Sequence, residues 1–397
     1  MIKIKPTIDH AANCPYCRQK LTTKQVLWQG MHTCVESYCT SCQKSLIEDL
    51  KVGHAIDKAY QVDLDRNLIF GHEGGKEWLG QPLLESLLKP QVEKINIEKE
   101  IFKPSQRVVI LNCLDYLYGH SLLKLLNAQR HLDSSPELGL VLIVPKFLRW
   151  LVPQGVAEVW TVNLPLNKGK LFYPQINQFI HQECQRFDEI YLSPAYSHPS
   201  QFDITRFTKV PKHDFSQPEF RITFIWREDR LWCDKIPFGI LRRLKLNRVL
   251  LLLQNWKVQR LFKKLKPQTP SAAFTVVGLG KTTAFPHWIE DFRVKQFDAS
   301  TEQKYCQIYA DSRLVIGIHG SNMLLPSSHA GMTIDLMREE RWGNFAQDIL
   351  YQEKDPRLTS FRYRYLPTQT SVTEICTIAT NMIKNYFKYH FAMMIDT

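Results

Sequence analysis

Residues 312–337, SRLVIGIHGSNMLLPSSHAGMTIDLM, decide the fold of this chain. An apolar run at 314–316 leads through a glycine-bearing turn at 319–322 into a short helical segment, and a second apolar run at 332–334 closes on Asp335. This succession of strand, turn, helix and strand is typical of a parallel α/β unit. A turn of this kind offers backbone N–H groups and small polar side chains to an anion. The segment therefore predicts a phosphate site. Asp335, at the end of the second strand, is placed to accept a hydrogen bond from a ribose hydroxyl.

The turn contains three polar side chains that can act on a ligand. His319 can donate a hydrogen bond to a phosphate or sugar oxygen, and the alternative is a core histidine satisfied by the backbone. Ser321 and Asn322 are natural N-caps of the helix that follows. Capping and ligand binding use the same end of that helix, so the two roles are compatible.

Strand-like and helix-like patterns alternate along most of the chain. Short apolar runs typical of buried strands lie at 108–111, 140–144, 156–162, 189–192, 221–226, 273–277 and 294–297. Apolar residues at helical spacing lie between them, and such alternation predicts parallel sheets. We therefore expect an α/β protein with two Rossmann-like domains, at 106–215 and 216–371, followed by a C-terminal helix at 372–397.

Two arginines follow the first predicted strand of the second domain. Arg227 and Arg230 can clamp a diphosphate with bidentate geometry, and Asp229 between them can orient one of the two. The alternative is a surface ion-pair cluster. Further along, GLGKTT at 278–283 resembles the end of a phosphate-binding P-loop but lacks the first glycine of that motif. We expect Gly280 instead to let a ligand approach the strand end closely.

The first domain offers two candidates for the catalytic base. Asp115 and His120 lie in or just after the loop that follows the strand at 108–111. Ligands of open α/β sheets bind beyond the carboxyl ends of the strands, and two such domains are expected to face each other across a cleft. Either residue can deprotonate an acceptor hydroxyl. The alternatives are a helix cap for Asp115 and helix packing for His120.

The first 50 residues contain two CxxC pairs. Cys14 and Cys17 form one pair, and Cys39 and Cys42 form the other. Four thiolates complete a closed tetrahedral zinc site, which leaves no open position for catalysis. We therefore expect residues 1–50 to be a zinc ribbon with a structural or docking role.

Two further features belong to this N-terminal region. Cys34 and His32 lie between the pairs and could substitute as zinc ligands. Residues 51–105 are rich in glycine, proline and charge, and we expect them to be a connector with one short helix at 83–88.

The bulk properties favour an anionic partner. The chain has 397 residues and a net charge of +12, which suits nucleic acid, phosphorylated metabolites, anionic lipid or acidic glycan. No apolar stretch approaches the roughly 20 residues that span a bilayer, and the N-terminus lacks the apolar core of a signal peptide. We expect a cytoplasmic protein, at most peripheral to the inner face of an anionic membrane.

These features together resemble glycosyltransferases of the GT-B architecture. The stretch 314–336 is most similar to the family-61 type, from which it departs at Ser321-Asn322, where alanine and glycine are usual. Arg227-Glu228-Asp229-Arg230 is similar to the arginine-rich donor motif of α-1,6-fucosyltransferase-like enzymes. The resemblance implies that the donor diphosphate, sugar and ribose contact Arg227, Arg230, His319, Gly320, Ser321, Asn322 and Asp335.

The resemblance implies an inverting glycosyltransferase of polysaccharide biosynthesis that needs no catalytic metal. It would transfer a sugar from a nucleotide-diphosphate donor to a hydroxyl of a glycan or glycolipid acceptor. One alternative is an enzyme similar to polysaccharide pyruvyltransferases, which share a related fold and an arginine-then-histidine turn. The other is a zinc-ribbon nucleic-acid-binding protein. The sequence has no arginine-rich tract or groove-reading helix, so nucleic acid is the less expected partner.

Overall fold

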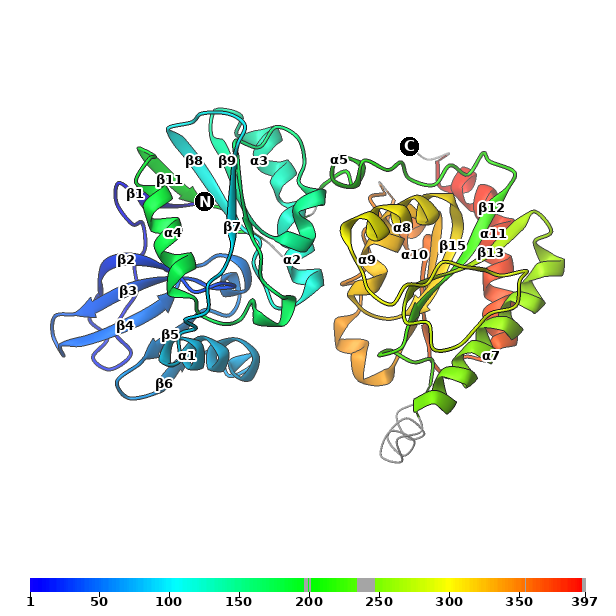
Figure 1. Ribbon diagram of the computed structural model, residues 1–397, viewed down its shortest axis with the longest axis horizontal. Coiled ribbons are helices and arrows are strands. Elements are labelled where there is room, and N and C mark those ends of the chain that lie inside the picture. The colour runs from blue at the N-terminus through cyan, green and yellow to red at the C-terminus, as the bar shows by residue number, and fades with distance from the viewer. Residues whose placement is uncertain (196–198, 200, 234–246, 354, 395–397) are drawn as a thin grey trace. The chain divides into compact units, whose positions relative to one another are not determined.

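A computed structural model of the protein describes residues 1–195, 199, 201–233, 247–353 and 355–394 (Figure 1). The chain divides into two compact units, unit 1 at 1–207 and unit 2 at 208–397. Each unit contains a sheet with parallel strands and helices that cover it, so the predicted α/β class is confirmed. The two units are described separately below.

The first sheet of unit 1 has a parallel core of four strands. Its strand order is β1-β11-β8-β9-β10-β7, in which the two edge strands run antiparallel to their neighbours. The strands are β1 (Ile2–Lys5), β7 (Ile97–Ile101), β8 (Arg107–Asn112), β9 (Gly139–Pro145), β10 (Glu158–Val162) and β11 (Glu189–Leu192). The helices are α2 (Tyr118–Leu126), α3 (Ala128–Ser134), α4 (Pro174–Cys184) and α5 (Thr205–Thr208). The chain crosses back between β10 and β11, which places α4 on the opposite face from α2.

The second sheet of unit 1 is antiparallel and contains the cysteine pairs. It runs β2 (Thr22–Trp28), β3 (Thr33–Cys39), β4 (Lys44–Asp49), β5 (Tyr60–Asp63) and β6 (Leu68–Gly71) in chain order. A 3-10 turn η1 (Gly53–Ile56), a π turn η2 (Lys76–Gly80) and helix α1 (Gln81–Leu88) follow its last strands or lie between them. Residues 51–105, predicted to be a connector, therefore supply two strands of this sheet and β7 of the first sheet.

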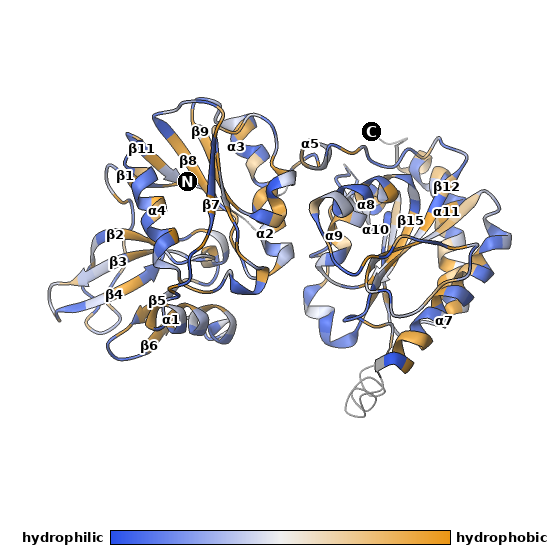
Figure 2. Cartoon of the chain, viewed as in Figure 1, coloured by the Kyte–Doolittle hydropathy of each residue, from blue (hydrophilic) through white to orange (hydrophobic). Residues whose placement is uncertain are grey.

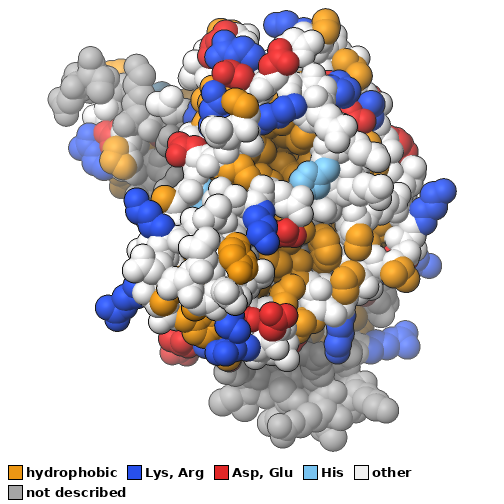
Figure 3. Space-filling model, turned by 90° about the vertical axis from the view of Figure 1, so that its left-hand side faces the viewer, with side chains coloured by type: hydrophobic (Ala, Val, Ile, Leu, Met, Phe, Trp, Pro, Cys, Tyr) orange, Lys and Arg blue, Asp and Glu red, His pale blue; other side chains and the backbone are white. Residues whose placement is uncertain are grey.

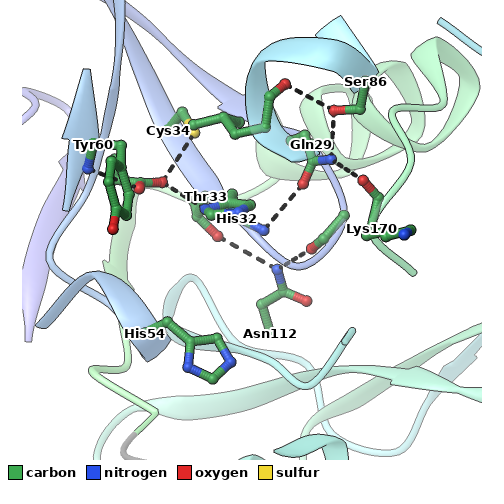
Figure 4. Close-up of polar contacts among 12 residues, drawn as sticks. Gln29, His32, Thr33, Cys34, His54, Tyr60, Ser86, Asn112 and Lys170 are labelled. Atoms are coloured by element: carbon green, nitrogen blue, oxygen red, sulfur yellow. Dashed lines mark hydrogen bonds and ion pairs between the residues drawn. The ribbon is translucent and has the colours of Figure 1, made fainter. Parts of the chain in front are cut away.

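The first 50 residues are likewise part of unit 1 rather than a separate ribbon. β1 pairs with β11 of the first sheet, and the loop between β2 and β3 is bonded to the end of β8 (Figure 4). Asn112 donates its amide to the carbonyl of Gly30 over 2.8 Å. Gln29 donates to the hydroxyl of Ser86 and to the carbonyl of Lys170 (Figure 4). Because these buried groups satisfy one another, the second sheet is fixed beside the carboxyl end of β8.

Unit 2 contains a six-stranded, fully parallel sheet. The order is β14-β13-β12-β15-β16-β17, the 3-2-1-4-5-6 order of a doubly wound Rossmann sheet. The strands are β12 (Phe220–Arg227), β13 (Ala272–Leu279), β14 (Glu290–Asp291), β15 (Ser312–Ile318), β16 (Met332–Met337) and β17 (Tyr363–Pro367). The predicted strand at 294–297 is wrong, because only Val294 forms a single bridge, to Leu279.

The helices of unit 2 bury the two faces of this sheet. They are α7 (Asn247–Leu265), α8 (Ala299–Asp311), α9 (Leu324–His329), α10 (Pro356–Arg362) and α11 (Val372–Met394). The predicted C-terminal helix is thus confirmed over its described part, and Ile375, Ala379 and Met382 of α11 join the same core as α7 and the strands. The short helical segment predicted after the central turn consists of a 3-10 turn η6 (Ser321–Met323) and the six α-helical residues of α9.

Hydropathy follows this architecture in both units. Figure 2 shows hydrophobic residues on the central strands and along α7. On the face of unit 1 in Figure 3, Lys and Arg side chains are interspersed with Asp and Glu around hydrophobic side chains near the middle. Among the described residues, none of the helices combines the length and the apolar character needed to cross a bilayer.

Candidate functional site

The predicted phosphate site lies at the switch point of the unit 2 sheet, where the order in which successive strands are added reverses from one edge to the other. β12 and β15 are adjacent and parallel, but the chain leaves β12 toward one edge of the sheet and leaves β15 toward the other. Ligands of doubly wound sheets bind beyond the carboxyl ends of the strands at this switch point. Arg227 is the last residue of β12, Arg230 follows three residues later, and His319 comes directly after β15. The two motifs singled out in the sequence therefore share one end of two neighbouring strands.

Arg230 contacts the turn that follows β15. Its Nη1 donates to the carbonyl oxygen of His319 over 2.7 Å. Gly320 has φ 144°, and a Cβ built there would lie 1.2 Å from Nη1 of Arg230. Only glycine therefore leaves room for the guanidinium at this turn. Burial lowers the pKa of Arg230, but an arginine keeps its proton at any physiological pH, so the turn holds a fixed positive charge.

The turn also offers unused hydrogen-bond donors. Among the described residues, the N–H groups of Gly320 and Ser321 have no protein partner. Asn322 donates its side-chain amide to the carbonyl of Ile318, while its Oδ1 is buried without a partner. The two free N–H groups and Arg230 can converge on one anion, as in backbone anion nests. Since α9 is so short, this binding would owe little to a helix dipole.

His319 lies between two buried carboxylates. Its Nδ1 is 3.0 Å from Oδ2 of Asp335 and 3.0 Å from Oδ2 of Asp348, and Tyr363 donates its hydroxyl to Asp335. Burial alone would lower the pKa of His319, but the two carboxylates outweigh it and raise the pKa to about 9. The imidazole is therefore charged at neutral pH. His319 is therefore not a core histidine whose hydrogen bonds are satisfied by the backbone, which was the alternative interpretation of the sequence.

Asp335 occupies a different place from the one predicted. β16 continues two residues beyond it to Met337, and the Asp335 side chain is fully buried against His319 and Tyr363. Burial raises the pKa of this carboxyl, and hydrogen bonds from His319 and Tyr363 offset part of that rise. A carboxylate enclosed in this way cannot reach a ribose hydroxyl. Asp335 instead orients His319.

We expect this cluster to make unit 2 more stable below neutral pH than in alkaline solution. The folded pKa of His319, about 9, lies above the ordinary histidine value of about 6.5. Its contribution to stability is therefore complete below about pH 6.5 and is lost as the pH rises through 9. Urea unfolding of the wild type should lose about 3 kcal/mol of unfolding free energy across this range. His319→Gln should flatten the dependence, and an equally steep loss in that variant would show that other groups cause it.

The remaining residues of the arginine motif are already paired. Arg227 makes a bidentate ion pair with Asp229, with both N···O distances at 2.8 Å. Glu228 accepts hydrogen bonds from the N–H and hydroxyl of Thr282, and its side chain occupies the space that a Cβ at Gly280 would need. The room beside Gly280 is thus filled by Glu228 rather than left open for a ligand. Arg230, which bonds the His319 carbonyl and has no carboxylate partner of its own among the described residues, is the better-placed charge.

In unit 1, the predicted base candidates Asp115 and His120 lie in one cluster. Asp115 is buried after β8 and accepts from His54 over 3.0 Å and from Lys124 over 2.9 Å, while Nδ1 of His120 lies 3.5 Å away. The His54 and His120 rings meet edge to face at 4.6 Å. Burial alone would raise the pKa of Asp115, but Lys124 and the two imidazoles hold it well below its usual range.

This geometry distinguishes what Asp115 and His120 can each do as a proton acceptor. The Asp115 side chain is 0% exposed and strongly held as an anion, so it is a poor proton acceptor. The His120 side chain is 27% exposed, and its Nδ1 lies 3.5 Å from Asp115 without forming a hydrogen bond to it. A histidine oriented by a buried carboxylate is the usual arrangement of a general base. In the structure, Asp115 is bonded to His54 and Lys124, and His120 is the more exposed imidazole beside them.

Three members of these clusters were missed in the sequence. His54 lies in η1, within the segment taken for a connector, and Lys124 sits in an apolar helical stretch. Asp348 lies in a loop with no periodic pattern. The one available signal was Lys124, a lysine flanked by leucines on the buried side of α2, since a buried lysine needs an acidic partner.

The four predicted zinc ligands converge in the second sheet of unit 1. The Sγ atoms of Cys14 and Cys42 are 3.4 Å apart, as are those of Cys17 and Cys39, and all four lie within 4.8 Å of one another. Thiolates at about 2.3 Å from a tetrahedral zinc would be separated by about 3.8 Å, so the cluster fits such an ion.

Cys34 and His32 take no part in this cluster. His32 pairs with Asp49 over 2.8 Å, and Cys34 donates to the same carboxylate over 3.4 Å (Figure 4). Asp49 also accepts from the N–H of Tyr60. The suggestion that either residue replaces a cysteine ligand is therefore wrong, because both are committed to Asp49 away from the four thiols.

Comparison with known proteins gives no family assignment. No family model and no curated protein matches the chain. Solved structures that align with it include the ADP-heptose lps heptosyltransferase II of E. coli, at 9% identity over 70% of this chain and 99% of that one, with a TM-score of 0.41. A putative UDP-N-acetylglucosamine 2-epimerase from Listeria monocytogenes aligns at 11% identity over 63% and 60%, with a TM-score of 0.28. The resemblance to family-61 glycosyltransferases stays a prediction from the sequence.

Proposed function

We propose that the protein is an inverting glycosyltransferase that uses a nucleotide-diphosphate sugar and needs no catalytic metal. The observation that carries this proposal is the contact of Arg230 with the His319–Gly320 turn at the switch point of the unit 2 sheet. The fixed positive charge of Arg230 and two free N–H groups at that position suit a diphosphate. Gly320, Ser321 and Asn322 would line the donor, and Arg227 would reach it by exchanging Asp229 for a phosphate oxygen.

The donor site would act on the leaving group. As the bond between the anomeric carbon and the diphosphate breaks, the electron pair leaves on the diphosphate oxygen. Arg230 and the N–H groups of the turn would stabilise the charge that develops on the diphosphate in the transition state more strongly than they stabilise the bound donor in the ground state. His319 adds no net positive charge there, because Asp335 and Asp348 balance it, but they hold its imidazole in place to donate a hydrogen bond to the donor.

The proposed base is His120. His120 would take the proton of the acceptor hydroxyl, whose oxygen then bonds to the anomeric carbon from the face opposite the diphosphate, which inverts its configuration. Asp115 would hold the imidazole in position and stabilise its charged form. The acceptor would be a glycan or glycolipid hydroxyl.

We expect His120→Gln to lower the turnover of the donor sugar about a hundredfold, since removal of a general base costs on this scale. Donor affinity should stay unchanged, because the donor site lies in unit 2. The assay measures nucleoside diphosphate release with the donor that stabilises the protein, at several pH values. His72→Gln, at an exposed histidine of unit 1, is the matched control and should leave turnover unaltered. Equal turnover in the two variants would exclude His120 as the base.

We also propose a structural zinc ion at Cys14, Cys17, Cys39 and Cys42. Support comes from the spacing of the four thiols and from their position between β3, β4 and the loop before β2, where an ion would cross-link the start of the chain to the second sheet. Four thiolates leave no open coordination position, so the ion would stabilise unit 1 and take no part in transfer.

A thermal-shift panel tests the proposed function against its nearest alternative. Nucleoside diphosphates should raise the melting temperature, because they carry the group that the switch-point site is proposed to bind. Stabilisation by phosphoenolpyruvate without any nucleotide effect would favour a pyruvyltransferase. Stabilisation by duplex or single-stranded nucleic acid alone, weakening steeply with salt, would favour a nucleic-acid-binding role.

A further inference from the structure

One helix of unit 2 exposes an apolar stripe that the proposed chemistry does not use. Val249, Leu252, Leu253 and Trp256 of α7 follow one another at helical spacing, and each is between 41% and 54% exposed. They form a stripe roughly 100° wide along the first half of the helix. The opposite side of α7 is the one that enters the core, through residues such as Leu250, Val258 and Phe262. The stripe is therefore not the side that holds the helix on its sheet.

The charge on α7 has a single sign. The helix contains no acidic residue, and its charged side chains are Arg248, Lys257, Arg260, Lys263 and Lys264. Arg260 and Lys263 are exposed and continue the apolar stripe along the same face of the helix. The Arg260 guanidinium lies over the Trp256 ring at 5.1 Å, where it partly shields the indole. This differs from the mixed charges seen on the face of unit 1 in Figure 3.

We propose that this face of α7 binds the surface of an anionic lipid bilayer. An amphipathic helix with leucine and tryptophan on one stripe and basic residues beside them lies in the plane of the interface, with its apolar side chains among the acyl chains. Arg260 and Lys263 would then contact anionic headgroups, each adding attraction that salt screens. A protein partner of mixed charge would not explain the absence of acidic residues along the whole helix. The location of hydrophobic residues on α7 is visible in Figure 2.

Co-sedimentation with vesicles tests this inference independently of any activity. The full chain should bind vesicles of equimolar phosphatidylglycerol and phosphatidylcholine and should bind phosphatidylcholine vesicles much more weakly. Leu252→Gln with Trp256→Gln should weaken binding to the anionic vesicles about tenfold or more, since both side chains lose apolar contact without a change of charge. Arg260→Gln with Lys263→Gln should reduce the dependence of binding on salt.

The control variant is Phe387→Gln with Phe391→Gln, two exposed aromatic residues on α11. It removes a similar apolar area from another helix of the same unit and should bind vesicles like the wild type. Equal loss in both double variants, or no binding of the wild type to anionic vesicles, would overturn the inference.

Stability and mass measurements on the vesicle-free protein complete the test. The stripe variant should keep the melting temperature and the mass of the wild type. A fall in the melting temperature of the size that core substitutions cause would mean that other residues of the same chain already cover the stripe. Conversion of a wild-type dimer to a monomer would mean that a second copy of the chain covers it. Either result would contradict the lipid assignment.

Discussion

Replacement of Cys39 by serine is expected to abolish binding of the proposed zinc ion and to destabilise unit 1. Cys39 is fully buried at the end of β3, and its Sγ lies 3.4 Å from that of Cys17. Structural zinc sites bind with about 10–16 kcal/mol at neutral pH, so loss of one of four thiolates should cost roughly 3 kcal/mol or more. Because the second sheet is bonded to the end of β8, the damage should extend beyond the cysteine cluster.

Zinc content per chain and urea unfolding measure this prediction. Cys34→Ser is a matched control, because Cys34 is equally buried in the same strand but donates to Asp49 outside the cluster. The control should keep its zinc and most of its stability. If Cys34→Ser lost as much zinc as Cys39→Ser, or if the wild type bound no zinc, the four-thiolate site would be wrong.

Arg230→Gln is expected to remove most of the affinity for nucleoside diphosphates. The guanidinium lies against Gly320 and bonds the His319 carbonyl, so it is already in place before a ligand arrives. Truncation of a pre-positioned charge that bonds a phosphate costs about 3–4 kcal/mol, which is roughly a hundredfold to a thousandfold in dissociation constant. Arg227→Gln should cost less, because Arg227 must first leave its ion pair with Asp229.

The control for this variant lies at the other end of the same strand. Arg221 is near the start of β12 and pairs with Glu290 and Asp311, so Arg221→Gln removes one positive charge from the sheet without touching the switch point. It should leave nucleotide affinity close to that of the wild type. Titration of both variants by isothermal calorimetry separates them, and equal losses would mean that only net charge attracts the nucleotide.

Most of the parallel core could be predicted from the sequence because its strands are short apolar runs bounded by loops. β8, β9, β11, β12, β13 and β15 all lie where such runs were found. The strands within residues 51–105 were not recognised. β6 of the second sheet and β7 of the first have partly exposed, mixed patterns such as IEKEI that resemble a charged connector. Antiparallel edge strands lack the continuous apolar signal of buried parallel strands.

Parts of the candidate sites could be predicted where residues are close in the sequence or where a rule of the fold brings the ends of two strands together. The contact of Arg230 with the His319–Gly320 turn follows from the rule that ligands bind at strand ends of adjacent strands. Asp335 was misplaced because a carboxylate within a buried strand looks like the end of that strand, and its partner Tyr363 lies 28 residues away. His54 and Asp348 reach their clusters only through tertiary folding, which no local pattern reports.

The most direct test of the central claim is the response of the wild type and Arg230→Gln to a panel of nucleoside diphosphates in a thermal-shift titration. We predict that at least one nucleoside diphosphate stabilises the wild type, that its parent nucleoside does so far less, and that Arg230→Gln loses the effect while Arg221→Gln keeps it. A wild type that responds to no nucleoside diphosphate, or an Arg230→Gln variant that responds like the wild type, would contradict a diphosphate site at the switch point of unit 2.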